Sequence, residues 1–136
     1  MTAIATRRFT ESSDSLLRFG LRLDAVCTGL CGVIGLFVAP RLASLSGLST
    51  TTEYVIAAGF VLYGLVVYML AALHAVRGPG IGVVIANIAF TVGAVLAVLP
   101  GVSPLTTTGI VLTLGSGVYT ALMADLQFMG VRRLRA

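Results

Sequence analysis

Five polar side chains in a largely apolar chain have types and positions that could do chemistry. They are Arg22, Asp24, His74, Asn87 and Asp125. Ionisable and amide groups at membrane depth usually face the interior of a helix bundle and pair with one another, because lipid offers them no partner. We therefore predict a buried network in which Arg22 neutralises an aspartate, and Asn87 and His74 form hydrogen bonds nearby. Arg22 and Asp24 are two positions apart on one helix and point in different directions, so this ion pair should join different helices.

Two other interpretations of the same residues stay open. Long or polar side chains near helix ends can extend to water and anchor the helices at the membrane surface. A carboxylate held inside the membrane can also serve as a proton or ion site, and Asp24 is the candidate for that role. Tyr63 and Tyr68 also lie deep in an apolar stretch, where each hydroxyl needs a hydrogen-bond partner.

The sequence predicts no catalytic, cofactor-binding or metal site. Cys27 and Cys31 are four apart on one helix face, whereas a redox pair is usually CxxC and a zinc site needs further ligands. We interpret both as small packing residues. His74 is the only histidine of the chain, which argues against a haem site. No Walker A, GxSxG, HExxH or EF-hand pattern occurs, so we expect a protein that is not an enzyme.

The composition indicates that these residues are positioned by membrane-spanning helices. Of the 136 residues, 57% are hydrophobic and 10% are charged, whereas a soluble domain has about 25% charged residues. A span needs about 20 apolar residues, so the chain has room for four. The net charge of +4 comes from arginines near helix ends. Such arginines favour anionic lipid headgroups as partners and argue against nucleic acid.

We predict an all-α fold, a transmembrane four-helix bundle with antiparallel, up-down-up-down topology. Pro40 is expected to end the first helix, and Thr50 with Glu53 to form a capping box that starts the second. The sequence RGPG at 77–80 is expected to be the turn before the third helix. The expected helices are 16–39, 53–76, 81–99 and 105–129. They form a single domain, 16–130, between a polar N-terminal tail or interfacial segment (1–15) and a basic C-terminal tail (131–136).

Small residues at four-residue spacing predict where these helices touch, because helices in lipid pack closely along such faces. Two of the stripes include an aspartate at the same end of the bundle. The stripes are Gly109, Thr113, Gly117, Ala121 and Asp125 in the fourth helix, Asp24, Thr28 and Gly32 in the first, and Ala89, Gly93 and Ala97 in the third.

The arginines predict the orientation in the membrane. Four lie before or at the start of the first helix, one in RGPG and three in the C-terminal tail, while Arg41 alone falls on the other side. By the positive-inside rule, both termini and the RGPG segment are cytoplasmic, and the protein is a multi-pass protein of the cell membrane.

The segment LRLDAVCTG, residues 21–29, together with Asn87 in the third helix, resembles a group of small four-helix integral membrane proteins of actinobacteria. Members of that group are usually without an assigned function. The resemblance implies the fold and the membrane location, and it transfers no catalytic or binding residues.

Short loops and small-residue stripes favour a non-enzymatic membrane protein that acts by helix packing. It would be a homo-oligomer or an accessory subunit of a larger membrane complex. The alternative is a small dimeric transporter or channel that uses Asp24. The small multidrug transporters are similar in size and helix number, but they centre on a glutamate deep in the first helix and use tryptophan. This chain has no tryptophan.

Overall fold

The computed structural model describes the backbone of residues 2–134 and the side chains of residues 14–134. Within these residues the chain forms helices and no strand. All four helices are long and apolar enough to cross a membrane. In α1, the candidate span is the part Asp14–Ser46. The predicted all-helical fold is confirmed, and it fits a multi-pass membrane protein. The helices are α1 (Thr2–Ser46), α2 (Thr50–Leu70), α3 (Arg77–Ala97) and α4 (Thr107–Arg133).

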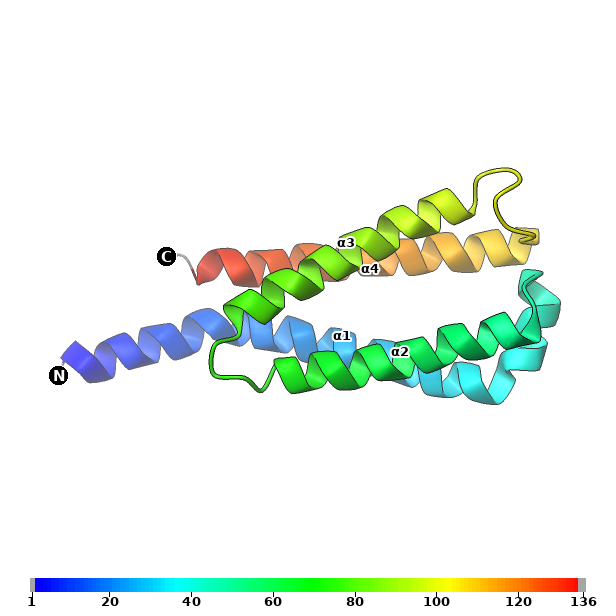
Figure 1. Cartoon of the computed structure of the whole chain (residues 1–136). Helices are drawn as coiled ribbons and strands as arrows, with labels where there is room; N and C mark the ends of the chain where they lie inside the picture. Colours follow the sequence, from blue (N-terminus) through cyan, green and yellow to red (C-terminus); the bar gives the residue numbers. More distant parts are fainter. Residues whose placement is uncertain (1, 135–136) are drawn as a thin grey trace.

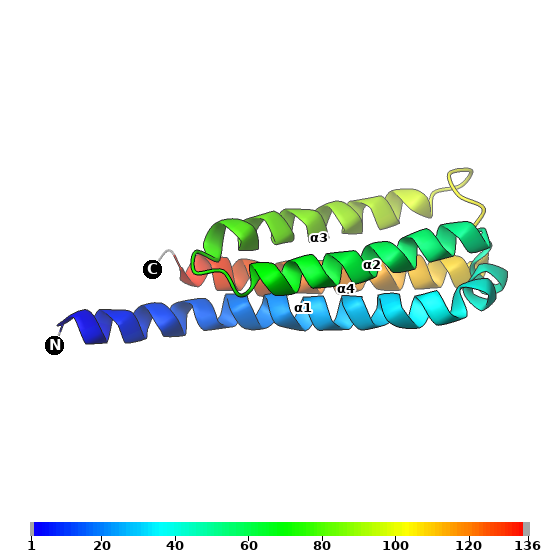
Figure 2. The ribbon, with the colours of Figure 1, turned by 60° about the horizontal axis from the view of Figure 1, so that its bottom comes forward.

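Neighbouring helices run antiparallel, and the two ends of the chain lie at the same end of the bundle (Figures 1 and 2). α1 packs mainly against α2 and α4, and α3 packs mainly against α4. α2 and α3 touch at only a few points. The bundle is therefore two tight hairpins joined along α1 and α4, with a loose seam between α2 and α3.

The predicted ends of the chain differ from the observed ones. The first helix was expected to begin at residue 16, but from Thr2 onward the backbone belongs to α1. That the segment 1–15 is a tail or an interfacial segment stays a prediction. α4 extends to Arg133, into the segment expected to be a tail. Met1, Arg135 and Ala136 lie outside the described residues, as do the side chains of residues 2–13, which include two of the counted arginines.

Pro40 does not end α1, contrary to the prediction, because a proline inside an apolar helix costs one backbone hydrogen bond while the surrounding turns stay paired. The helix continues to Ser46. Its last turn is held by the segment before α4. Thr106 donates from its backbone N–H to Ser46 O at 2.9 Å and from its hydroxyl to Leu45 O.

The start of α2 also differs from the predicted capping box. Ser49 caps the helix and accepts a hydrogen bond from the Thr52 N–H at 3.1 Å. The Glu53 side chain does not reach back to the start of the helix. Its Oε1 accepts a hydrogen bond from Ser46 Oγ at 2.5 Å, in a buried position. Glu53 therefore ties the end of α1 to the start of α2.

Residues 77–80 form the first turn of α3 rather than a loop, because proline is well tolerated where the backbone N–H has no helical partner. The connection from α2 is residues 71–76, and Arg18 holds it. The guanidinium donates to Ala71 O and Leu73 O at 2.7 Å each, and to His74 O at 3.1 Å. It also forms an ion pair with Asp14 at 3.1 Å. A cationic donor at the C-terminal end of a helix satisfies carbonyls that have no partner within the helix.

We expect Arg18→Ala to lower the free energy of unfolding by about 1–2 kcal/mol, because three carbonyls lose a charged donor. Arg22→Ala is the matched control, since the Arg22 side chain is exposed one turn later on the same helix. It should change the free energy by less than about 0.5 kcal/mol. Unfolding by sodium dodecyl sulfate in maltoside micelles, followed by circular dichroism, measures both. Equal losses would show that the guanidinium does not hold the connection.

An apolar core closes the bundle at the end where the termini lie. Its residues come from all four helices and from the 71–76 connection, so this core joins the four helices at this end. The core consists of Leu17, Leu21, Ala25, Val67, Ala71, Val76, Val83 and Val131.

The buried residues of α4 follow steps of three and four, not the strict step of four that was predicted. A step of four residues advances about 40° beyond a full turn, so a strict stripe rotates out of the interface. Accordingly, Ala121 and Asp125 are exposed. In α3, Ala89 and Gly93 are exposed as well. The buried positions are Gly109, Gly117, Thr120, Ala124, Gln127, Gly130 and Val131 in α4, and Gly80, Val83, Val84, Asn87 and Ala94 in α3.

α1 and α2 make their closest approach at two glycines. A methyl group added to Gly64 would lie 2.7 Å from Ala25 O and 2.9 Å from Gly29 Cα. One added to Gly32 would lie 2.7 Å from Ala57 O. Only a residue without a side chain fits at these crossings, so the small residues predicted to pack in α1 do so here.

Candidate functional site

Asp24 lies on the buried face of α1, directly beyond the apolar core, with a solvent exposure of 0%. Its Oδ1 accepts hydrogen bonds from Thr28 Oγ1 at 3.0 Å and from the Tyr119 hydroxyl at 2.9 Å. A carboxylate removed from water needs such partners, because an unpaired buried charge is very costly.

The second carboxylate oxygen, Oδ2, accepts three more hydrogen bonds. The donors are the Tyr63 hydroxyl at 2.7 Å, Asn87 Nδ2 at 2.9 Å and Gln127 Nε2 at 3.0 Å. Each of the four helices therefore supplies at least one donor to one carboxylate. We refer to these six residues, Asp24, Thr28, Tyr63, Asn87, Tyr119 and Gln127, as the Asp24 cluster.

The cluster is a connected network in which the donors are all neutral groups. Asn87 Nδ2 also donates to Gln127 Oε1 at 3.0 Å. Among residues 14–134, no buried side-chain nitrogen or oxygen is left without a hydrogen-bond partner. Residues 14–134 contain one ion pair, between Arg18 and Asp14, and Asp24 takes part in none. Hydrogen bonds alone thus balance the buried charge, which makes the network sensitive to the loss of any member.

A second set of hydrogen bonds aligns α3 with α4 beside the cluster. The Thr91 hydroxyl donates to Asn87 O at 3.0 Å and lies 2.7 Å from the Thr120 hydroxyl. Thr120 in turn donates to Gly117 O at 2.9 Å. These bonds fix the rotation of both helices and so the direction in which the Asn87 side chain points.

Of the five residues predicted to form a network, the structure brings together Asp24 and Asn87. The side chains of Arg22, His74 and Asp125 are exposed, so their predicted place in a buried network is wrong. The Arg22 side chain lies on a different face of α1 from Asp24, and the Asp125 side chain lies on the exposed face of α4. His74 lies beyond the end of α2 and accepts a hydrogen bond only through its backbone carbonyl.

Sequence reasoning missed Thr28, Tyr119 and Gln127 as partners of Asp24. The expectation that the Tyr63 hydroxyl has a partner is confirmed, whereas Tyr68 is 53% exposed. One signal could have identified Gln127. It lies three residues after Ala124 and four before Val131, in a repeat of three and four that marks the buried face of a bundle helix.

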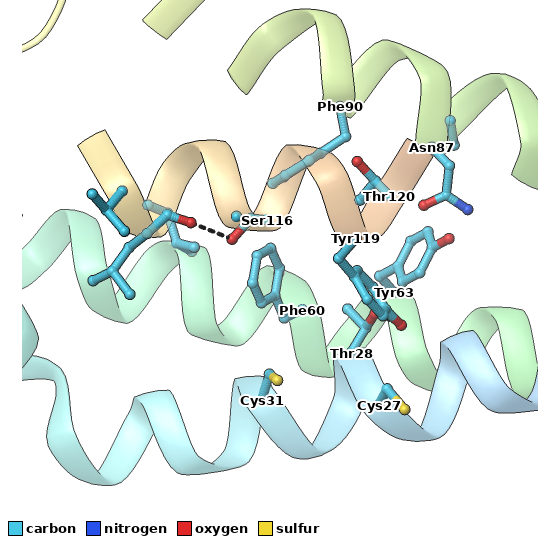
Figure 3. A pocket seen from close by; sticks show the side chains of 16 residues that line it. Cys27, Thr28, Cys31, Phe60, Tyr63, Asn87, Phe90, Ser116, Tyr119 and Thr120 are labelled. Atoms are coloured by element: carbon cyan, nitrogen blue, oxygen red, sulfur yellow. Dashed lines mark hydrogen bonds between the residues drawn. The ribbon is translucent and has the colours of Figure 1, made fainter. Parts of the chain in front are cut away.

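A cavity of about 740 Å³ lies beside the cluster and is lined by residues of all four helices (Figure 3). Its polar end is lined by Thr28, Tyr63, Asn87, Tyr119 and Thr120, and the rest of its wall is mostly apolar. The Asn87 carbonyl oxygen lies on the cavity side of its amide group, and the nitrogen lies on the side that contacts Asp24 (Figure 3). Asp24 itself lies behind this polar end, out of contact with the cavity.

Two phenylalanines face each other across the seam between α2 and α3. The ring centroids of Phe60 and Phe90 are 5.9 Å apart, with the rings tilted by 59°. Both rings line the cavity. Because the two helices have few other contacts, this ring pair is one of the few contacts that span the seam beside the cavity.

Both cysteines border the cavity, which corrects their interpretation as packing residues. Cys31 is exposed and Cys27 is half-buried, and both are free thiols. They lie on the face of α1 that looks toward Phe60 and Tyr63 (Figure 3).

Comparison of the chain with protein-family models, with curated proteins and with solved structures found no match. The chemistry of the site therefore rests on its geometry. In residues 14–134, no group of three histidine, cysteine or acidic side chains is close enough to hold a metal ion. The arrangement suits the binding of a molecule that is apolar along most of its length and polar at one end.

Proposed function

We propose that this chain is a non-enzymatic, multi-pass protein of the cell membrane that binds a lipid-soluble molecule in the cavity between its helices. The observation that carries the proposal is the cavity itself, which is apolar along most of its wall and ends at the Asp24 cluster. Sites for small molecules have volumes of about 300–1,000 Å³ and combine apolar walls with a few polar groups. The cavity of about 740 Å³ fits this description.

The cavity favours binding over a role in helix packing alone. Protein interiors are close-packed, and a bundle that serves only as a packing unit has no reason to keep a space of this size. In this chain the apolar core fills the bundle at the end where the termini lie, while a cavity remains between the helices beyond the Asp24 cluster. The energetic cost of that cavity is offset when a ligand fills it.

The loose seam between α2 and α3 supports entry from the side. The helices of the two hairpins are connected mainly through α1 and α4. Tyr63 and Asn87 hold α2 and α3 together at the Asp24 cluster, so the two helices can separate only beyond it, at the level of Phe60 and Phe90. In the proposed orientation, with both termini cytoplasmic, the cavity lies in the outer half of the membrane. A lipid-soluble molecule would enter from the acyl chains past Phe60 and Phe90.

A substitution that fills the cavity tests this function. We expect Cys31→Phe to lower the affinity for 1-decanol, a neutral single-chain probe, at least about tenfold, because the ring occupies the space beside Phe60. Leu30→Phe is the control, since it adds the same ring one position away, at a residue that is 57% exposed and does not line the cavity. Native mass spectrometry of both variants from maltoside micelles measures the bound fraction.

The unsubstituted protein should bind one decanol, and Leu30→Phe should bind it equally well. Equal binding by Cys31→Phe, or no binding by the unsubstituted protein, would contradict the proposal. The second of these outcomes would leave the packing or accessory role as the better account.

A further inference from the structure

The atoms that the Asp24 cluster presents to the cavity are hydrogen-bond acceptors. The hydroxyl hydrogens of Tyr63 and Tyr119 are both directed to Asp24, so neither phenol has a hydrogen left to donate to a ligand. The Asn87 amide nitrogen donates to Asp24 and Gln127, which uses both of its hydrogens. Its carbonyl oxygen is the part that lies toward the cavity (Figure 3). A ligand must therefore supply the donor.

The buried carboxylate makes the same end of the cavity electrically negative. Asp24 is fully buried, and no cationic side chain among residues 14–134 pairs with it. A ligand group hydrogen-bonded to the Tyr63 oxygen would lie about 5 Å from the carboxylate, two hydrogen-bond lengths away. Because little water separates them, the attraction for a positive charge is much larger than at a protein surface.

Aromatic rings line the path between the polar end and the seam. The faces of aromatic rings attract cations, most strongly where water is excluded. Tyr63 and Tyr119 stand at the polar end, and Phe60 and Phe90 stand farther along the wall (Figure 3). These rings can make favourable contacts with both the apolar body and the charged group of an amphipathic cation.

We propose that the ligand of this cavity is an amphipathic cation, a protonated amine on an apolar body. This inference rests on the proposed function and names the chemical class of its ligand. The ammonium group donates to the oxygens of Tyr63, Tyr119 and Asn87, and the apolar body lies along the wall that Phe60 and Phe90 line. A neutral hydroxyl at the same place gains one hydrogen bond and no charge attraction. A carboxylate is repelled by Asp24 and finds no donor.

Three probes with one chain length and different head groups test the charge preference. Decylamine, 1-decanol and decanoate are offered at pH 7 to the protein in neutral maltoside micelles, and native mass spectrometry measures the bound fraction of each. We expect decylamine to bind at least about tenfold more tightly than decanol, and decanoate not to bind. Exposed arginines at the terminal end repel the amine, so surface adsorption cannot produce this order.

Substitutions test whether the buried charge of Asp24 causes the preference for the amine over the alcohol. Asp24→Asn should bring the affinity ratio of amine to alcohol close to one, whereas Asp125→Asn, at an exposed aspartate, should leave the ratio unchanged. Tyr63→Phe keeps the carboxylate and removes one acceptor, so the ratio should fall by an intermediate factor. If Asp24→Asn does not fold, comparison of the three head groups on the unsubstituted protein and on Tyr63→Phe still tests whether the cavity prefers a cation.

Equal binding of amine and alcohol, or a ratio that survives Asp24→Asn, would overturn the cation inference while the proposed function stands. Failure of all three probes to bind would overturn both.

Discussion

Asp24→Ala should lower the free energy of unfolding by about 3–5 kcal/mol, the largest effect that we expect for a single polar side chain of this protein. The substitution leaves five donors without their acceptor in a water-poor interior. Each unsatisfied buried donor costs about 1–3 kcal/mol in soluble proteins. Values between membrane helices average nearer about 0.6 kcal/mol, because the unfolded state in the membrane also finds partners. Five donors place the sum in the range given.

Asp125→Ala is the matched control for this measurement. Both aspartates lie in long helices toward the same end of the bundle, but the Asp125 side chain is exposed. Its removal should change the free energy of unfolding by less than about 0.5 kcal/mol. Unfolding by sodium dodecyl sulfate in maltoside micelles gives both values. A loss below about 1 kcal/mol for Asp24→Ala would show that the Asp24 cluster does not hold the four helices together.

A single methyl group at Gly64 should be almost as damaging. The new Cβ would lie 2.7 Å from Ala25 O and 2.9 Å from Gly29 Cα, and both are backbone atoms that cannot move aside alone. α1 and α2 must then separate along their main contact, which costs about 2–3 kcal/mol by analogy with overpacked cores. Because Thr28 and Tyr63 flank this crossing, the geometry of the Asp24 cluster should change as well.

Gly59→Ala provides the comparison on the same helix. A Cβ at Gly59 meets nothing within 4 Å, and alanine favours the helix by up to about 1 kcal/mol over glycine. The first variant should therefore unfold at a lower detergent fraction than the unsubstituted protein, and the second at an equal or higher one. Equal stability of the two variants would contradict the close approach of α1 and α2 at Gly64.

The four helices could be predicted from hydropathy because each apolar stretch is long enough to cross a bilayer by itself. Their ends could not be predicted as well, since the deciding contacts are tertiary. Pro40 remains inside α1 because the segment before α4 holds the helix end at Ser46. The 71–76 connection depends on Arg18, whose three carbonyl contacts lie more than 50 positions further along the chain.

The site was predictable in its centre and not in its surroundings. Asp24 and Asn87 could be identified because a strongly polar residue in an apolar span needs a partner. A strict four-residue spacing placed both Asp125 and Asp24 on stripes of small residues, so both were expected to be buried. The bundle instead buries steps of three and four, which place Gln127 inside and Asp125 outside. The cavity has no local sequence signal, because it arises from two helices that hardly touch.

The division of the Asp24 cluster between the two hairpins has a consequence for biogenesis. The hairpin of α1 and α2 emerges first from the ribosome and carries the carboxylate with two of its donors, Thr28 and Tyr63. The other three donors, Asn87, Tyr119 and Gln127, arrive only with α3 and α4. A copy truncated after α2 thus keeps the Asp24 carboxylate with only two of its five donors, Thr28 and Tyr63. The carboxylate is therefore fully hydrogen-bonded only after both hairpins have been made and packed together.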